Sequence, residues 1–194
     1  MQKIILASQS PRRKQLLQWA EIPFEVKSSE TDESYPEDLS PQEIAIHIAR
    51  NKALAVLHAD KEADAAIPKI PILAADTIVV LNNEIIGKPL NRSDAIKILQ
   101  KLSGKKHLVI TGVVILFNKN EVAFADKTEV EFHELTNEQI EFYVDNYKPF
   151  DKAGAYAIQE WIGVVGIKSV NGDFYNVMGL PISRVLIELQ KMEK

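Results

Sequence analysis

The sequence has no cysteine, and this absence removes several kinds of site at once. Disulfide bonds, thiolate zinc sites and cysteine nucleophiles all need that residue, and its absence suits a reducing compartment. The chain also has no excess of positive charge: its formal net charge is -4 over 194 residues. Proteins that coat nucleic acid need a basic surface to displace counterions from phosphates, so we expect no nucleic-acid partner.

Long apolar runs and targeting signals are also lacking. No stretch approaches the roughly 18 consecutive apolar residues of a membrane span. The opening MQKIILASQSP has no long apolar core of the kind that signal peptides carry. We therefore expect a cytoplasmic protein with no membrane partner.

Several common catalytic motifs are absent. No GxGxxG follows a predicted strand, and LSGKK around Gly104 lacks the earlier glycine of a Walker A loop at the position of Leu99. There is no GxSxG elbow of a serine hydrolase. The four histidines form no pair at metal-ligand spacing: His47, His58, His107 and His133. A Rossmann site, a P-loop, a serine triad and a histidine zinc site are thus disfavoured.

What the sequence does contain is an alternation of strand and helix patterns, which predicts an α/β fold with a mixed sheet in one large domain or two joined lobes. Apolar runs predict strands at 3–7, 73–81, 84–86, 109–117 and 121–132. Capping and periodicity predict helices that begin at Ser10-Pro11, at Ser40-Pro41 (to about Ala59), at Ser93 (to Leu102), at Thr136 and near Ile182. Ala59 to Pro71 is the expected exposed connection.

Two charged residues stand where the pattern calls for apolar ones. Lys52 lies in the middle of the apolar face of the helix predicted after Ser40. Its side chain either covers apolar surface while the ammonium reaches water, or directs a cation into a cleft. Asp76 interrupts the strand LAADTIVVL. It either bonds a neighbouring loop at a strand end or meets a cation or metal, because a buried carboxylate without a partner is costly.

Other charged residues complete a set suited to a triphosphate and a metal. Arg12 and Arg13 lie beside a predicted helix N-terminus, and Lys88 and Lys152 lie in loops after apolar segments. Guanidinium groups and helix N-termini bind phosphate, whereas Mg²⁺ prefers carboxylates such as that of Glu33 together with substrate oxygens. The spacing leaves open whether these residues converge.

Short sequence blocks are spread in order along nearly the whole chain. They are ASQSPRR (7–13), Asp32-Glu33, ARNKA (49–53), AADT (74–77), GKP (87–89), Ser103-Gly104, TGV (111–113), DKAGAYAIQ (151–159) and GLP (179–181). Together these blocks resemble the Maf family of nucleoside triphosphate pyrophosphatases. The resemblance implies a curved mixed β-sheet with flanking helices, two lobes around a central cleft and a single domain over residues 1–194, similar in architecture to the inosine triphosphate pyrophosphatases. It also implies hydrolysis of a nucleoside triphosphate to the monophosphate and pyrophosphate with a divalent cation, Mg²⁺ or Mn²⁺.

The resemblance also assigns roles to individual residues. It implies Asp76 as the proton acceptor, Glu33 with Asp76 as metal ligands, and a phosphate-binding set of Ser8, Arg13, Lys52 and Lys88. Substrate choice falls to Arg12, Thr77 and Gln159, which match family members that prefer dTTP and UTP. The amide of Gln159 can donate to and accept from the imide edge that uracil and thymine share. Glu160 is a departure, because the family often has glycine there.

The most direct expectation is therefore a house-cleaning enzyme of nucleotide metabolism that acts on dTTP, UTP or modified pyrimidine analogues. Two alternatives remain open. One is a pyrophosphatase for 7-methyl-GTP or another modified nucleotide, and the other is a non-catalytic nucleotide-binding regulator of cell division. The resemblance also allows a homodimer.

Overall fold

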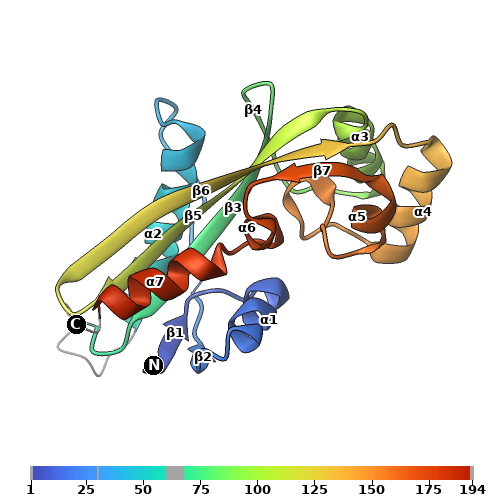
Figure 1. Cartoon of the computed structure of the whole chain (residues 1–194). Helices are drawn as coiled ribbons and strands as arrows, with labels where there is room; N and C mark the ends of the chain where they lie inside the picture. The colour runs from blue at the N-terminus through green and yellow to red at the C-terminus, as the bar shows by residue number, and fades with distance from the viewer. Residues whose placement is uncertain (1, 30, 60–67, 193–194) are drawn as a thin grey trace. The chain divides into compact units, whose positions relative to one another are not determined.

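The computed structural model describes residues 2–29, 31–59 and 68–192, and it has the predicted alternation of strands and helices (Figure 1). No helix within these ranges has the length and apolar character that crossing a bilayer demands. The strands are β1 (Ile4–Leu6), β2 (Phe24–Val26), β3 (Ile72–Leu81), β4 (Glu84–Ile86), β5 (Lys106–Phe117), β6 (Asn120–Phe132) and β7 (Ile167–Asn171). The helices are α1 (Pro11–Trp19), α2 (Pro41–Ala59), α3 (Arg92–Leu102), α4 (Asn137–Tyr147), the 3₁₀ turn η1 (Ala153–Ala155), α5 (Trp161–Gly166), α6 (Phe174–Met178) and α7 (Ile182–Met192).

Within the described residues the strands form one mixed sheet of seven strands, which confirms the predicted fold class. The order is β2-β1-β3-β5-β6-β7, with β4 paired to β3. β1 runs parallel to both β2 and β3, whereas β4 and β7 pair antiparallel with β3 and β6. The β3–β4 turn has both of its central residues, Asn82 and Asn83, at positive φ, the conformation that suits a two-residue hairpin.

The chain divides into two compact units. Unit 1 contains residues 1–76, 111–126 and 179–194, and unit 2 contains residues 77–110 and 127–178. The expectation of a single domain over residues 1–194, with a cleft between two lobes, stays a prediction.

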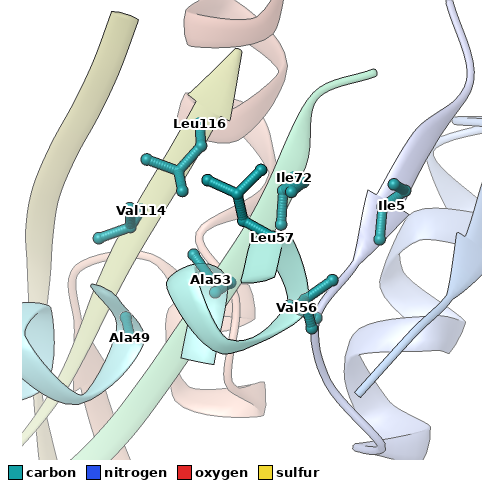
Figure 2. Close-up of a cluster of buried hydrophobic side chains, with 10 residues drawn as sticks. Ile5, Ala49, Ala53, Val56, Leu57, Ile72, Val114 and Leu116 are labelled. Atoms are coloured by element: carbon teal, nitrogen blue, oxygen red, sulfur yellow. The ribbon is translucent and has the colours of Figure 1, made fainter. Parts of the chain in front are cut away.

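Helix α2 packs its apolar face on the strands of unit 1 (Figure 2). Ala49, Ala53 and Val56 meet side chains from β1, β3 and β5, and all are buried. Small residues allow the helix to approach the sheet closely. A Cβ atom placed on Gly112 of β5 would lie 2.2 Å from the backbone carbonyl carbon of Ala45, so only glycine fits at this crossing.

Local capping explains where three helices begin. Ser10 Oγ accepts from the backbone N–H of Arg13, and α2 and α4 both start with reciprocal capping boxes, Ser40 with Glu43 and Thr136 with Gln139. These three starts match the sequence prediction.

The predicted cap of α3 was wrong. Asn91, not Ser93, is the N-cap, and its Oδ1 accepts from the backbone N–H of Asp94 at 3.0 Å. The helix therefore begins at Arg92, with Ser93 inside its first turn. Asparagine and serine are comparable caps, so the sequence alone favoured neither strongly.

The sequence prediction also missed several short elements: β2, η1, α5, β7 and α6. None of these exceeds six residues, which is too short for a period to emerge. Most of the predicted connection from Ala59 to Pro71 falls on residues 60–67, which lie outside the described residues.

Candidate functional site

Arg13 is anchored where β1 passes into α1. Its Nε donates to the carbonyl oxygen of Gly179 at 2.8 Å, and its NH1 donates to Ser8 Oγ at 3.1 Å. Only 8% of Arg13 is exposed, so the guanidinium plane is fixed by buried contacts rather than by solvent. Ser8 thus contacts the arginine directly, and any part it has in binding phosphate includes holding that side chain in place.

Lys52 connects the two carboxylates that the resemblance assigns to the metal. Its Nζ lies 2.6 Å from Asp76 Oδ1 and 2.8 Å from Glu33 Oε1. The side chains of Lys52 and Asp76 are only 18% and 13% exposed. The lysine therefore does not simply reach into water, and the aspartate meets a cation. The role of Lys52 in a cleft stays a prediction.

Electrostatics place Arg13 in the same cluster. Burial lowers the pKa of Arg13, while the negative charges of Asp76 and Glu33 raise it and the neighbouring Arg12 lowers it. Arginine stays charged through such shifts because its ordinary pKa is so high. Six of the predicted site residues belong to unit 1: Ser8, Arg12, Arg13, Glu33, Lys52 and Asp76. Direct contacts join Ser8 to Arg13, and Lys52 to both Glu33 and Asp76.

The donor set fits a divalent cation that is completed by substrate. No group of three or more His, Asp or Glu side chains that could hold a metal occurs in the described part of the chain. However, carboxylate oxygens of Glu33 and Asp76 converge on one positive centre, the Lys52 ammonium. Mg²⁺ commonly uses one or two carboxylates and takes its remaining oxygens from phosphates and water. Glu33 and Asp76 are therefore suitable ligands.

Two loops that carry predicted residues touch each other within unit 2. The backbone N–H of Gly154, in the DKAG turn, donates to the carbonyl oxygen of Gly87, which directly precedes Lys88. Gly154 has φ 71°, and a Cβ there would lie 2.9 Å from the Val79 side chain. Val79 shares a face of β3 with Thr77, because alternate residues of a strand point the same way. The turn and the lysine loop are therefore positioned by one packing arrangement, on the strand face that also carries Thr77.

Gln159 lies exposed in the compact loop that joins η1 to α5. Lys152, which the sequence grouped with the phosphate-binding cations, is instead buried and contacts carboxylates: its Nζ is 2.8 Å from Asp151 Oδ1 and 3.6 Å from Glu160 Oε1. The contacts of Lys152 therefore stabilise the loop itself.

A buried aromatic group holds the middle of the same loop. Tyr156 OH lies 2.8 Å from His107 Nε2, and the histidine ring stacks on Phe132 with centroids 5.5 Å apart. His107 Nδ1 has no hydrogen-bond partner among the described residues. Burial lowers the pKa of His107 to about 4 and raises that of Tyr156, so both are neutral near pH 7.

Sequence reasoning missed the supports of these residues. The carbonyl of Gly179 lies in the GLP block, but nothing in the sequence indicates that it accepts from Arg13. Tyr143 is on the buried face of α4, and its OH accepts from the backbone N–H of Ala157 at 3.2 Å. The sequence did place Tyr143 on a helix face predicted to be buried. Because a buried hydroxyl requires a hydrogen-bond partner, this position could have indicated that Tyr143 binds a neighbouring segment.

The sequence was compared with known proteins. A family described as "Maf-like protein" matches residues 3–192. A dTTP/UTP pyrophosphatase of Cytophaga hutchinsonii is 50% identical over 97% of this chain and 84% of its own length. A dTTP/UTP pyrophosphatase of Phocaeicola vulgatus is 47% identical over 98% of this chain and 96% of its own.

A solved structure has the same fold. The HAM1 protein from Coxiella burnetii superposes with a TM-score of 0.53 and covers 98% of this chain and 100% of its own, at 15% identity. A structural match at 15% identity shows that the fold is shared and nothing further. The family match over almost the full length and the two relatives show more: this chain belongs to the Maf family.

Proposed function

We propose that this protein is an enzyme that hydrolyses nucleoside triphosphates, with dTTP and UTP preferred, to the nucleoside monophosphate and pyrophosphate. One observation carries the proposal: a lysine joined to two carboxylates lies within electrostatic reach of a buried arginine in unit 1. The relatives named dTTP/UTP pyrophosphatase support the choice of substrate.

In the proposed reaction a water molecule attacks the α-phosphorus, and pyrophosphate leaves. Asp76 accepts the proton of that water. The contact between Lys52 and Asp76 Oδ1 fixes the carboxylate, and we assign the proton to its other oxygen, Oδ2. The proposed reaction requires no covalent intermediate.

The cations of the site neutralise the phosphate chain. Arg13 is held rigidly by Ser8 and Gly179, so little conformational entropy is lost when it binds an anion. Lys52 supplies a second positive charge from α2, and we assign Lys88 to phosphate as the resemblance implies. Preorganised positive charge of this kind stabilises the charge that develops on the leaving group.

A divalent cation, Mg²⁺ or Mn²⁺, is the proposed cofactor, and Glu33 and Asp76 are its proposed ligands. When bound, it would supply Lewis-acid stabilisation of phosphate charge. Arg12, Thr77 and Gln159 are assigned to the choice of base.

A panel of triphosphates tests the proposal. Purified protein is incubated with dTTP, UTP, CTP, GTP and 7-methyl-GTP in the presence of Mg²⁺ or Mn²⁺, and pyrophosphate and orthophosphate are measured separately. We expect pyrophosphate release that is fastest with dTTP and UTP. Preference for 7-methyl-GTP would reassign the substrate, orthophosphate release would reassign the bond that is cleaved, and nucleotide binding without turnover would favour the regulator.

A further inference from the structure

The loop that carries Gln159 is closed by its own backbone. The N–H of Glu160 donates to the carbonyl of Ala157 at 3.1 Å, and the N–H of Gly163 donates to the carbonyl of Glu160 at 2.9 Å. Gly163 lies so close beneath the loop that a Cβ there would be 1.7 Å from the carbonyl oxygen of Ile158. The segment 157–163 is therefore a tight turn with little backbone freedom.

The side chain of Glu160 connects this turn to helix α4. Its Oε2 accepts a hydrogen bond from Tyr143 OH, and the same hydroxyl accepts from the backbone N–H of Ala157. Tyr143 is 0% exposed. One buried hydroxyl thus contacts the turn twice, through the backbone of Ala157 on one side of Gln159 and through the side chain of Glu160 on the other.

Lys152 completes this network with the second carboxylate oxygen. Its Nζ lies 3.6 Å from Glu160 Oε1, and its side chain is only 8% exposed. Glu160 therefore uses its two oxygens on partners from two separate segments, α4 and the residue before η1. A hydrogen bond to a carboxylate in a poorly solvated place is stronger than one in water.

The usual local role of a residue at this position does not account for Glu160. It is the N-cap of α5, yet its side chain makes no capping hydrogen bond. A carboxylate at an N-cap ordinarily bonds the N–H groups of its own helix. Here the carboxylate instead bonds Tyr143 and lies beside Lys152.

We propose that Glu160 is a positioning residue that, through Tyr143 and Lys152, holds Gln159 in the orientation that selects uracil and thymine. This inference rests on the proposed function, in which Gln159 reads the base. It goes beyond that function because it assigns base selectivity to three residues that need not touch the substrate. Misplacement of a recognising amide by an ångström is enough to cost about 10²-fold in rate.

The test measures the ratio of kcat/KM for UTP to that for CTP in four variants. Glu160→Ala and Tyr143→Phe break the network, and each is expected to lower the ratio by roughly 10- to 100-fold. Glu160→Gln keeps an acceptor for Tyr143 and is expected to restore most of the ratio. Asp145→Asn is the matched control, because it removes an ion pair between Arg92 and α4 that involves no residue of the turn.

A double variant separates positioning from loss of stability. If Glu160 acts through Gln159, then Gln159→Ala with Glu160→Ala has the same ratio as Gln159→Ala alone, because the network has nothing left to position. A further fall in the double variant, or an unchanged ratio in both Tyr143→Phe and Glu160→Ala while circular dichroism reports folded protein, overturns the proposal.

The result remains decisive if the wild-type protein releases no pyrophosphate from any triphosphate. In that case the proposed function has failed, and calorimetric binding of UTP and CTP replaces turnover in the same variants. Amide hydrogen exchange of residues 157–163 is measured alongside. Faster exchange and lost discrimination in Tyr143→Phe support positioning, whereas unchanged exchange and unchanged discrimination refute it.

Discussion

The buried pair His107 and Tyr156 predicts how stability depends on pH. Burial lowers the pKa of His107 to about 4 from an ordinary 6.5, and the residue is only 2% exposed. Between these two values the unfolded chain binds a proton that the folded chain does not bind. The free energy of unfolding must therefore decrease as the pH falls through this window.

The magnitude follows from the size of the shift. Each pKa unit corresponds to about 1.4 kcal/mol, so the full contribution, reached below pH 4, is about 3 kcal/mol. At pH 5 the same linkage gives a loss of roughly 2 kcal/mol relative to pH 8. His107 Nδ1 has no acceptor among the residues described, so a proton placed there would lack a hydrogen bond, which agrees with the direction.

The perturbation is the double substitution His107→Phe with Tyr156→Phe, which removes both hydrogen-bonding groups together. The chain has two tryptophans, and Trp161 belongs to unit 2 with His107, so a Trp19→Phe background gives a fluorescence signal from that unit. Urea unfolding at pH 8 and at pH 5 then yields the acid-induced loss. We expect the double variant to lose roughly 2 kcal/mol less than its parent.

Gln100→Ala is the matched control, because Gln100 is exposed and its side chain has no titratable group, so the acid-induced loss should stay unchanged. Equal losses in the parent and the double variant would show that His107 is protonated normally in the folded state. The argument from burial would then be wrong.

Other predictions concern the site and its supports. Asp76→Asn should lower turnover by about 10²- to 10⁴-fold in a pyrophosphate assay while circular dichroism stays unchanged; near-normal turnover would remove Asp76 as the base. Arg12→Trp should change which triphosphate is preferred, whereas Arg13→Lys should slow all of them, because lysine lacks the guanidinium fork; equal and uniform losses would make both arginines a simple phosphate clamp. A chelator such as EDTA should abolish turnover, and Mg²⁺ or Mn²⁺ should restore it; full activity in EDTA contradicts the proposed cofactor. Gly163→Ala should lower the free energy of unfolding by about 2 kcal/mol or more, measured by urea titration; Gly87→Ala, where a Cβ meets nothing within 4 Å, should not.

Much of the fold could be predicted because its signals are local. Four consecutive residues are enough to predict where α2 begins, at Ser40, and where α4 begins, at Thr136. The structure has both capping boxes. The segment 161–178 gave no such signal. It folds into α5, β7 and α6, which are short and are stabilised mainly by packing that the sequence does not reveal.

The candidate site was predictable only in its parts. Periodicity identified Lys52 and Asp76 as charged residues in apolar surroundings, but their contact joins positions 24 residues apart, which no local pattern reports. The resemblance supplied the roles, and the structure supplied the convergence of the unit 1 residues. The burial of Lys152 could not be predicted, since a lysine in a small-residue loop has the same sequence pattern whether its side chain points to solvent or is buried beside Glu160.

The close crossing of α2 and β5 has a consequence for how this protein can vary. Ala45 touches the strand at Gly112, and Lys52 lies seven residues further along the same helix, about 10 Å at 1.5 Å per residue. Any side chain at position 112 would push the helix outward, and a stiff helix transmits that shift along its length. In a screen for lost activity, position 112 should therefore behave like an active-site position even though glycine has no reactive group. The proposed role of Lys52 in binding phosphate thus depends on glycine at position 112, where no side chain fits.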